Sequence, residues 1–539
     1  MKVLGINAVF HDPAAALVVD GEVVAASEEE RFNRRKHGHE NVPFAAWEVP
    51  ERAARWCLAS AGLGVGDLDA VAYSYDPALA PQVNGSVAVD DWEPLRTLYA
   101  QRAPLFLRTA LPGLEPGRVR FVEHHLAHAA SAALASPFDS CAVMTLDGRG
   151  ERTSYLAGVA RGDGIEVLHR QPLPHSLGLF YEELTGHLGF RRSSDEYKVM
   201  AMGAFGEPRF LDLMRRRVYA DGSGGFATEP VDWGSLAPPA DGERLDGVHF
   251  DLAASAQRRL EEVVLELARW LHARTGERRI ALAGGVALNC VANARLAGEG
   301  PFDEVWVQPA SGDSGTALGA AMHVAAALGD AVRPMRTAAL GRGWSDEELR
   351  EWLDRAGAEY EEPGDLEGTV AEILAGGTVV GWFQGRSEYG PRALCRRSLL
   401  ADPRAAEMQE TLNAIKGRES FRPVAPVVLE DRAAEIFEGV IPSPYMLFTH
   451  RVKPQWRDRV AGVVHRDGTA RIQTLRPEEE PRAGRLLQRF ADLTGVPVLV
   501  NTSFNTAGRP IVDDPRDALE VLGSAPLAAL AIGPFLVRR

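Results

Sequence analysis

Residues 2–27, KVLGINAVFHDPAAALVVDGEVVAAS, predict three short strands in close succession. Residues 2–7 and 14–19 are mostly apolar, a tight Asp20-Gly21 turn follows, and residues 23–27 form the third strand. The same order of strand, loop, strand, turn and strand returns further along the chain. Its second copy comprises residues 142–146, 153–159 and 165–169. The repeat predicts two related α/β lobes facing a cleft, and an accidental pair of hairpins is the alternative.

Two strand–glycine–helix units follow the second copy. After a helix predicted over 252–275, strand 280–283 leads through Gly284-Gly285 into a helix that opens near Leu288. Strand 305–307 leads through Ser-Gly-Asp-Ser-Gly at 311–315 into a helix over 316–328. Such turns bring backbone N–H groups close to a phosphate or nucleotide at a helix N-terminus.

The domain boundary is predicted near residue 340. The Gly/Pro-rich residues 221–247 are expected to form a loop, and 333–345 a linker. Beyond it come a helix around 370–374, a strand over 378–383 and a Gly/Arg-rich segment. We therefore expect domains over 1–340 and 341–539, a size typical of two domains in a chain of 539 residues.

Composition excludes several classes of protein. A net charge of −15 disfavours nucleic acid as a general partner. Four cysteines without a CxxC pair disfavour a zinc ribbon and a disulfide framework, and they fit a reducing cytoplasm. The first 20 residues make a poor signal peptide, and no apolar run reaches the ~18 residues of a membrane span. We expect a cytoplasmic protein that does not associate with a membrane.

A histidine pair indicates a metal site. His124 and His128 lie in an Ala-rich segment predicted to be helical, so their i, i+4 spacing places both on one face. Asp147 and Asp313, in glycine-flanked turns, are candidates for the remaining ligands if both turns face the same cleft. Surface histidines and turn-forming aspartates are the alternatives.

Two further groups of residues carry chemistry. In the second half, arginines accompany Gly-Pro and Asn-Thr-Ser turns, a pattern that suits phosphate oxygens, although a solvated charged surface also fits. In the first half, His11 lies in the loop after the first strand, where it is either a general base or a structural histidine.

Taken together, these segments resemble the NodU/CmcH family of O-carbamoyltransferases. The resemblance runs in order from end to end of the chain. Its motifs are FHDPAAA at 10–16, EEERF at 28–32, KHG at 36–38, HHLAHAAS at 124–131, DG at 147–148, GGVALN at 284–289, GPRAL at 390–394, FRPVAP at 421–426 and NTSFN at 501–505.

The resemblance implies an α/β chain with an N-terminal actin-like ATPase (ASKHA) two-lobed domain and a C-terminal YrdC-like α/β domain. It implies that carbamoyl phosphate and ATP form carbamoyl-adenylate in the C-terminal domain. The N-terminal domain would then transfer the carbamoyl group to a hydroxyl of a small-molecule natural product. The implied cofactors are a divalent metal, with Fe²⁺ favoured over Zn²⁺ or Mn²⁺, and Mg²⁺ bound with ATP.

The resemblance also implies residue roles. His11 would be the catalytic base and Lys36 would lie near the acceptor. The implied metal ligands are His124, His128, Asp147 and Asp313. The implied nucleotide and carbamoyl phosphate contacts are Gly285, Asn289, Arg392, Lys416, Arg422, Arg471, Asn501 and Ser503.

The acceptor stays open at this point. The loop over 7–11 is shorter than in the aminoglycoside-modifying members of the family, and residues 221–247 also differ, so no acceptor is carried over. Transfer of threonylcarbamoyl to tRNA and a non-catalytic nucleotide-binding regulator are the competing functions. A homodimer is left open.

Overall fold

The computed structural model describes residues 1–38, 48–80, 92–439 and 442–539. The chain divides into two compact units, Met1–Thr337 and Ala338–Arg539. Each unit is described separately below. None of the helices in the described parts of the chain combines the length and apolar character that a membrane span requires.

The first lobe of unit 1 is built on a five-stranded sheet of order β3-β2-β1-β4-β5. Strand β2 pairs antiparallel with both β1 and β3, whereas β4 pairs parallel with both β1 and β5. Residues 3–6 of β1 are fully buried. The bounds are β1 Lys2–Asn7, β2 Ala14–Val19, β3 Glu22–Glu28, β4 Ala70–Tyr73 and β5 Val119–Phe121.

The second lobe repeats this sheet. Its order, β12-β11-β6-β7-β8, places the first strand of the repeat, β6, between an antiparallel and a parallel neighbour, as β1 is in the first lobe. The predicted duplication is confirmed, and with it the two-lobed arrangement. The bounds are β6 Ser140–Leu146, β7 Thr153–Arg161, β8 Gly164–Pro172, β11 Arg279–Ala283 and β12 Glu304–Val307.

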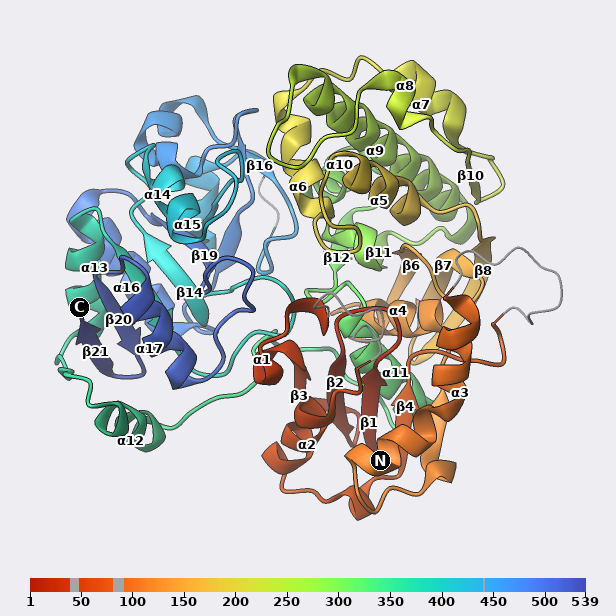
Figure 1. Cartoon of the computed structure of the whole chain (residues 1–539), viewed down its shortest axis with the longest axis horizontal. Coiled ribbons are helices and arrows are strands. Elements are labelled where there is room, and N and C mark those ends of the chain that lie inside the picture. The colour runs from red at the N-terminus through yellow and green to blue at the C-terminus, as the bar shows by residue number, and fades with distance from the viewer. Residues whose placement is uncertain (39–47, 81–91, 440–441) are drawn as a thin grey trace. The chain divides into compact units, whose positions relative to one another are not determined.

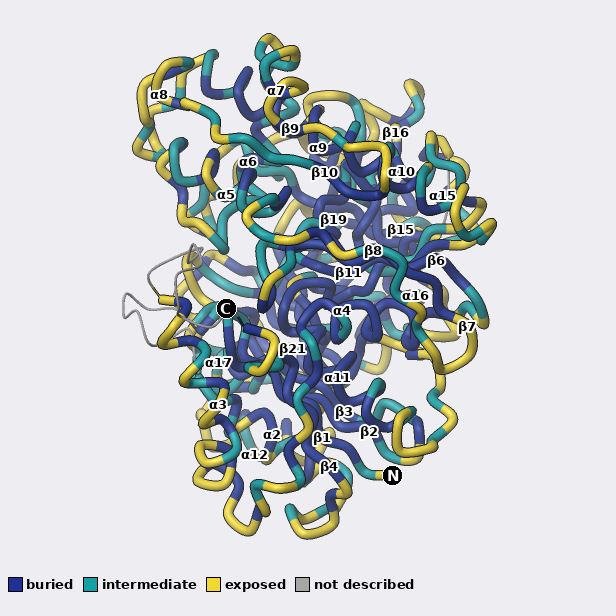
Figure 2. The backbone as a smooth tube through the Cα atoms, turned by 90° about the vertical axis from the view of Figure 1, so that its right-hand side faces the viewer, coloured by how far each residue is buried: buried dark blue, intermediate teal, exposed yellow. Residues whose placement is uncertain are grey.

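Two helices connect the lobes (Figure 1). Helix α11 (Ser314–Ala327) packs on β1, β2 and β4, helix α4 (His124–Ala133) packs on β6, β7 and β11, and the two helices pack on each other. A Cβ at Gly319 would lie 1.8 Å from the Ala127 carbonyl oxygen, so this approach requires a residue without a side chain. Both helices are mostly buried, and so are the strands β1 and β6 at the centre of the two sheets (Figure 2).

Other helices cover this framework. They are α1 Glu30–Asn33, α2 Glu51–Ser60, α3 Glu93–Ala110, α5 Leu177–His187, α6 Glu196–Met202, α7 Leu211–Arg217, α8 Trp233–Leu236, α9 Gly247–Thr275 and α10 Cys290–Glu299.

The segment 221–247 differs from the predicted loop. It contains β10 (Phe226–Thr228), which pairs with β9 (Val218–Ala220), and the short helix α8. Helix α9 begins at Gly247 rather than at 252, because His249 Nδ1 accepts a hydrogen bond from the Asp246 N–H at 2.9 Å and helps to cap the helix. The apolar periodicity begins only at Leu252, so it could not reveal this first turn.

Unit 2 is a mixed α/β unit, as expected. Its seven-stranded sheet has the order β18-β15-β19-β14-β13-β20-β21. Trp382, Phe383, Phe490, Phe504 and Phe535 are fully buried in its core. The main strands are β13 Val379–Phe383, β14 Arg397–Ala401, β15 Ala425–Leu429, β18 Gln473–Leu475, β19 Val498–Ser503, β20 Ala529–Ile532 and β21 Phe535–Arg538. A two-stranded ribbon pairs β16 His450–Arg451 with β17 Thr469–Ala470, and the helices are α12 Asp346–Ala356, α13 Leu366–Ala375, α14 Met408–Ile415, α15 Glu430–Ile436, α16 Pro481–Thr494 and α17 Pro515–Ser524.

Candidate metal centre and arginine-rich site

The candidate centre of unit 1 lies where strands end and helices begin. Ser74 and Asp147 directly follow β4 and β6, and Gly284 directly follows β11. His124 is the first residue of α4, and Asp313 is the N-cap of α11. The carboxyl ends of parallel strands are where α/β sheets usually bind ligands.

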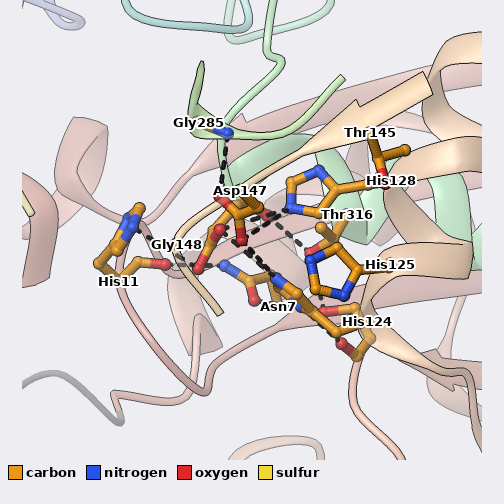
Figure 3. Close-up of polar contacts among 12 residues, drawn as sticks. Asn7, His11, His124, His125, His128, Thr145, Asp147, Gly148, Gly285 and Thr316 are labelled. Atoms are coloured by element: carbon orange, nitrogen blue, oxygen red, sulfur yellow. Dashed lines mark hydrogen bonds and ion pairs between the residues drawn. The ribbon is translucent and has the colours of Figure 1, made fainter. Parts of the chain in front are cut away.

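Four side chains converge there, and Figure 3 labels three of them, His124, His128 and Asp147. His124 Nε2 and His128 Nε2 lie 3.4 and 3.7 Å from Asp147 Oδ2, and both lie 3.6 Å from Asp313 Oδ1. The i, i+4 spacing on α4 therefore does place both imidazoles on one face. All four residues are buried, and their ligand atoms lie within 4.8 Å of one another.

The donor atoms of this cluster fit a metal ion. Within the described residues, His124 Nε2, His128 Nε2 and both Asp313 carboxylate oxygens have no hydrogen-bond partner. Buried polar atoms in native proteins are nearly always paired, so this group of unpaired atoms needs an explanation. Two imidazoles and two carboxylates facing one point form a ligand set for a divalent transition metal.

Charge is balanced inside the cluster. Burial alone would lower the pKa of His124, but the carboxylates of Asp313 and Asp147 outweigh it and hold that pKa well above its usual range. Burial alone would raise the pKa of Asp147, and the two histidines hold it well below its usual range. The carboxylates therefore stay ionised in the buried cluster, as metal ligands must be.

Neighbouring groups fix the orientation of the ligands. The His124 Nδ1–H faces the Ser74 carbonyl at 3.1 Å, which directs Nε2 to the cluster. Glu151 accepts the backbone N–H of His124 at 2.9 Å, at the start of α4. Nothing in the sequence pattern marks Glu151 for this role. His125 turns away, with Nδ1 2.8 Å from Thr153 Oγ1, so it takes no part in the cluster.

His11 approaches the cluster from the loop between β1 and β2. Its Nε2 lies 3.7 Å from Asp313 Oδ2, and its Nδ1 lies 2.9 Å from Asp12 Oδ2. Burial disfavours the charged ring, but the Asp313 and Asp12 carboxylates outweigh it and raise the pKa of His11 to about 10. Lys36 lies in the turn Lys36–Gly38, next to His37, whose ring contacts the same Asp12 carboxylate.

The predicted nucleotide contacts of unit 1 take two forms. The Gly285 backbone N–H donates to Asp147 Oδ1 at 2.9 Å, so the glycine turn is bonded to the metal cluster. The Asn289 side chain caps α10 and exchanges hydrogen bonds with the Gln257 amide at 2.8 and 3.1 Å. Its amide is therefore already engaged inside the lobe.

In unit 2, Lys416 is held by the turn after β19. Its ammonium donates to Ser503 Oγ at 2.8 Å, to Asn505 Oδ1 at 2.6 Å and to the Ser503 carbonyl. Lys416 and Ser503 are thus brought together as the sequence suggests. Asn505 lies in the same sequence motif, but motif membership alone does not distinguish it as a partner of Lys416.

Two of the remaining predicted residues of unit 2, Arg392 and Arg471, lie in segments that contact Asn501. The Asn501 amide donates to the Ala393 carbonyl at 3.1 Å and to Gln473 Oε1 at 2.7 Å, which brings the chain next to Arg392 and near Arg471 alongside β19. The Arg422 carbonyl accepts from Asn413 on α14, the helix that ends before Lys416. The segments of Arg392 and Arg471 thus meet at Asn501, and Arg422 precedes β15, where Ala425 pairs with Asn501. The binding roles of the three arginine side chains stay predictions.

Comparisons with known proteins cover nearly the whole chain. A family model described as Carbamoyltransferase N-terminus matches residues 2–226 and 236–322, and one described as Carbamoyltransferase C-terminus matches 371–539. The nodulation protein NolNO of Sinorhizobium fredii is 38% identical over 99% of this chain and 80% of its own length. The nodulation protein NolO of Bradyrhizobium diazoefficiens is 39% identical over 78% of this chain and 79% of its own length. An uncharacterized protein of Synechocystis, sll1178, is 38% identical over 100% of this chain and 96% of its own length.

Two family models together span most of both units, and the relatives are similar over most of their own length. The chain therefore belongs to the carbamoyltransferase family and is an enzyme that transfers carbamoyl groups.

Proposed function

We propose that the enzyme is an ATP-dependent O-carbamoyltransferase with a division of labour between its two units. Unit 2 would convert carbamoyl phosphate, ATP and water into carbamoyl-adenylate, pyrophosphate and phosphate. Unit 1 would transfer the carbamoyl group to a hydroxyl of a small-molecule natural product and release AMP. The observation that carries the proposal is the buried cluster of His124, His128, Asp147 and Asp313 with its unpaired donor atoms.

These four residues would hold the divalent metal. Imidazole and carboxylate ligands suit Fe²⁺, Zn²⁺ and Mn²⁺, and the family resemblance favours Fe²⁺. When bound, such an ion supplies positive charge against the charge that develops on the leaving phosphate. The hydrogen bond between Gly285 and Asp147 would keep the nucleotide turn and the ligand set in one fixed arrangement.

His11 would be the general base. Its Nε2 would take the proton of the acceptor hydroxyl while that oxygen attacks the carbamoyl carbon and the bond to AMP breaks. The Asp313 and Asp12 carboxylates favour the protonated ring. A cation held by Asp313 would offset that carboxylate charge, so the neutral base belongs to the metal-loaded enzyme.

Unit 2 would bind phosphates through cations and backbone turns. Arg392, Arg422 and Arg471 would contribute guanidinium groups, each of which can donate two parallel hydrogen bonds to phosphate oxygens. Lys416 would contribute a positive charge whose position is fixed by Ser503 and Asn505. Mg²⁺ would accompany the ATP phosphates.

The test is a reaction of the full chain with ATP, carbamoyl phosphate, Fe²⁺ and a panel of hydroxylated natural products. We expect pyrophosphate release that requires carbamoyl phosphate, and a product heavier than its acceptor by one HNCO unit. Threonine with bicarbonate replaces carbamoyl phosphate in a parallel reaction. Pyrophosphate release in that reaction alone would favour threonylcarbamoyl transfer and refute the proposal.

A further inference from the structure

The Asp12 carboxylate bridges two histidines. Its Oδ2 lies 2.9 Å from His11 Nδ1, and its Oδ1 lies 2.7 Å from His37 Nδ1. An ionised carboxylate only accepts hydrogen bonds, so each of these ring nitrogens carries the hydrogen. The other nitrogen of His11, Nε2, points to the metal cluster, 3.7 Å from Asp313 Oδ2. The bridge thus selects which nitrogen of His11 faces the reacting groups.

Asp12 stays an anion in this position. Burial alone would raise its pKa, but His37 and His11 outweigh burial and hold the pKa of Asp12 well below its usual range. A carboxylate that is buried without such partners would cost far more free energy than one that is paired. The two histidines therefore stabilise the anion that orients one of them.

The backbone around the bridge adopts an unusual conformation. Asp12 and His37 have φ angles of 51° and 60°, in the left-handed region that is unfavourable for a residue with a side chain. Hydrogen bonds hold it: Asn7 Nδ2 donates to the His11 and Asp12 carbonyls at 2.9 and 3.0 Å. Glu30 Oε2 accepts the His37 N–H at 2.9 Å. Strain that is held in place in this way is common at functional sites.

The same hydrogen bonds reach the metal cluster. Ser74 Oγ donates to Asn7 Oδ1 at 3.2 Å, and the Ser74 carbonyl faces His124 Nδ1 at 3.1 Å. Thr316, on α11, donates to Ser74 Oγ at 2.8 Å. The loop that carries His11 and the helix that carries the first cluster histidine are therefore fixed to one residue, Ser74. If the His11 ring turned, the metal cluster could not move with it, because Ser74 holds both the loop and the helix in place.

From this geometry we propose that Asp12 is a positioning residue for transfer, which orients His11 and fixes its Nδ1–H form, with His37 bracing the carboxylate from the other side. The inference rests on the proposed role of His11 as the base. A base that is misdirected by an ångström loses much of its effect, because the proton transfer requires a hydrogen-bond distance.

The experiment compares two nucleophiles in the full chain supplied with ATP, carbamoyl phosphate and Fe²⁺. Glycerol is the hydroxyl probe and needs a base, whereas hydroxylamine attacks carbamoyl-adenylate unaided and gives hydroxyurea and AMP. For Asp12→Ala we expect kcat with glycerol to fall about 10- to 100-fold, while KM for glycerol and the yield of hydroxyurea stay close to wild type. Asp12→Asn should recover part of the loss, because its amide oxygen can still accept the Nδ1–H.

The control is Asp20→Ala, which removes another aspartate of left-handed conformation, φ 51°, from the exposed β2–β3 turn. It should react with both nucleophiles as wild type does. Equal glycerol turnover in Asp12→Ala and wild type would overturn the inference. So would an equal loss of both products in Asp12→Ala and Asp12→Asn, which would mean that Asp12 only stabilises the fold.

A crystal structure of Asp12→Ala separates this inference from the proposed function. If wild type released no pyrophosphate at all, the proposed function would fail, and the structure alone would decide the role of Asp12. We expect the His11 ring to turn so that Nε2 no longer points to Asp313. A ring that keeps its wild-type position would overturn the inference.

Discussion

The backbone N–H of Gly285 donates a hydrogen bond to Asp147 Oδ1 at 2.9 Å, and the other oxygen of that carboxylate faces the two histidines of α4. The two residues follow neighbouring parallel strands, β11 and β6, in which Ala283 pairs with Thr145. One carboxylate thus joins the glycine turn to the metal cluster. A change in the turn is therefore expected to reach the cluster through Asp147.

Gly284→Ala and Gly285→Ala should separate folding from function. Gly284 has φ +92°, and a Cβ there would lie 2.2 Å from the Leu146 carbonyl oxygen, so this substitution should cost about 3 kcal/mol or more. At Gly285 a Cβ would lie 3.1 Å from Asp147 Oδ1, which presses on the side chain alone. We expect that variant to fold and to bind metal about tenfold more weakly. Thermal unfolding and metal titration measure the two effects, and equal destabilisation by both variants would contradict this assignment.

His124→Ala should remove metal and transfer while leaving adenylate formation largely intact. It deletes one of the two imidazoles that face Asp147 and Asp313, and metal affinity should fall by more than about tenfold. Metal analysis of the purified protein and pyrophosphate release are the measurements. His125→Gln is the matched control on the same helix, since His125 bonds to Thr153 outside the cluster. Full metal content and full transfer in His124→Ala would show that the cluster has no such role.

Arg392→Ala should stop pyrophosphate release. If its guanidinium neutralises phosphate charge, the loss should be about 100-fold in rate, the usual effect of removing one such group. Arg432→Ala is the control from the same unit, because Arg432 forms an ion pair with Glu435 on α15. Unchanged pyrophosphate release in Arg392→Ala, with carbamoyl phosphate and ATP both saturating, would exclude Arg392 from the activating site.

The fold was predictable wherever a pattern was local. The hairpins of both lobes and the spacing of His124 and His128 depend on short stretches, and the structure has them where the sequence places them. The contacts that complete the centre were not predictable. Glu151 accepts a hydrogen bond from the first residue of α4, although it lies in a different loop. Asp12 bonds to His37, which lies 25 residues away in the sequence. Such pairings depend on how the loops fold back, and neither periodicity nor spacing contains that information.

Glu29 provides a prediction about stability and pH. Its carboxylate is buried and accepts the N–H groups of Ala53 and Arg52 at the start of α2, at 2.8 and 3.3 Å. Burial raises the pKa of Glu29 from 4.5 to about 7. Because the folded pKa exceeds the unfolded one, the contribution of this group to stability is complete below about pH 4.5 and is lost as the pH rises through 7.

Glu29→Gln should therefore change the pH dependence of unfolding. The glutamine stays neutral and keeps an oxygen for the Ala53 N–H, so the variant lacks the loss that wild type suffers between these two pKa values. Relative to the variant, wild type should lose up to about 1.4 kcal/mol of unfolding free energy for each pH unit in that window, and no more above it. Urea unfolding of both proteins across the window measures this slope. A difference that stays constant with pH would mean that Glu29 is ionised throughout, and that the two backbone N–H groups of α2 offset the whole effect of its burial.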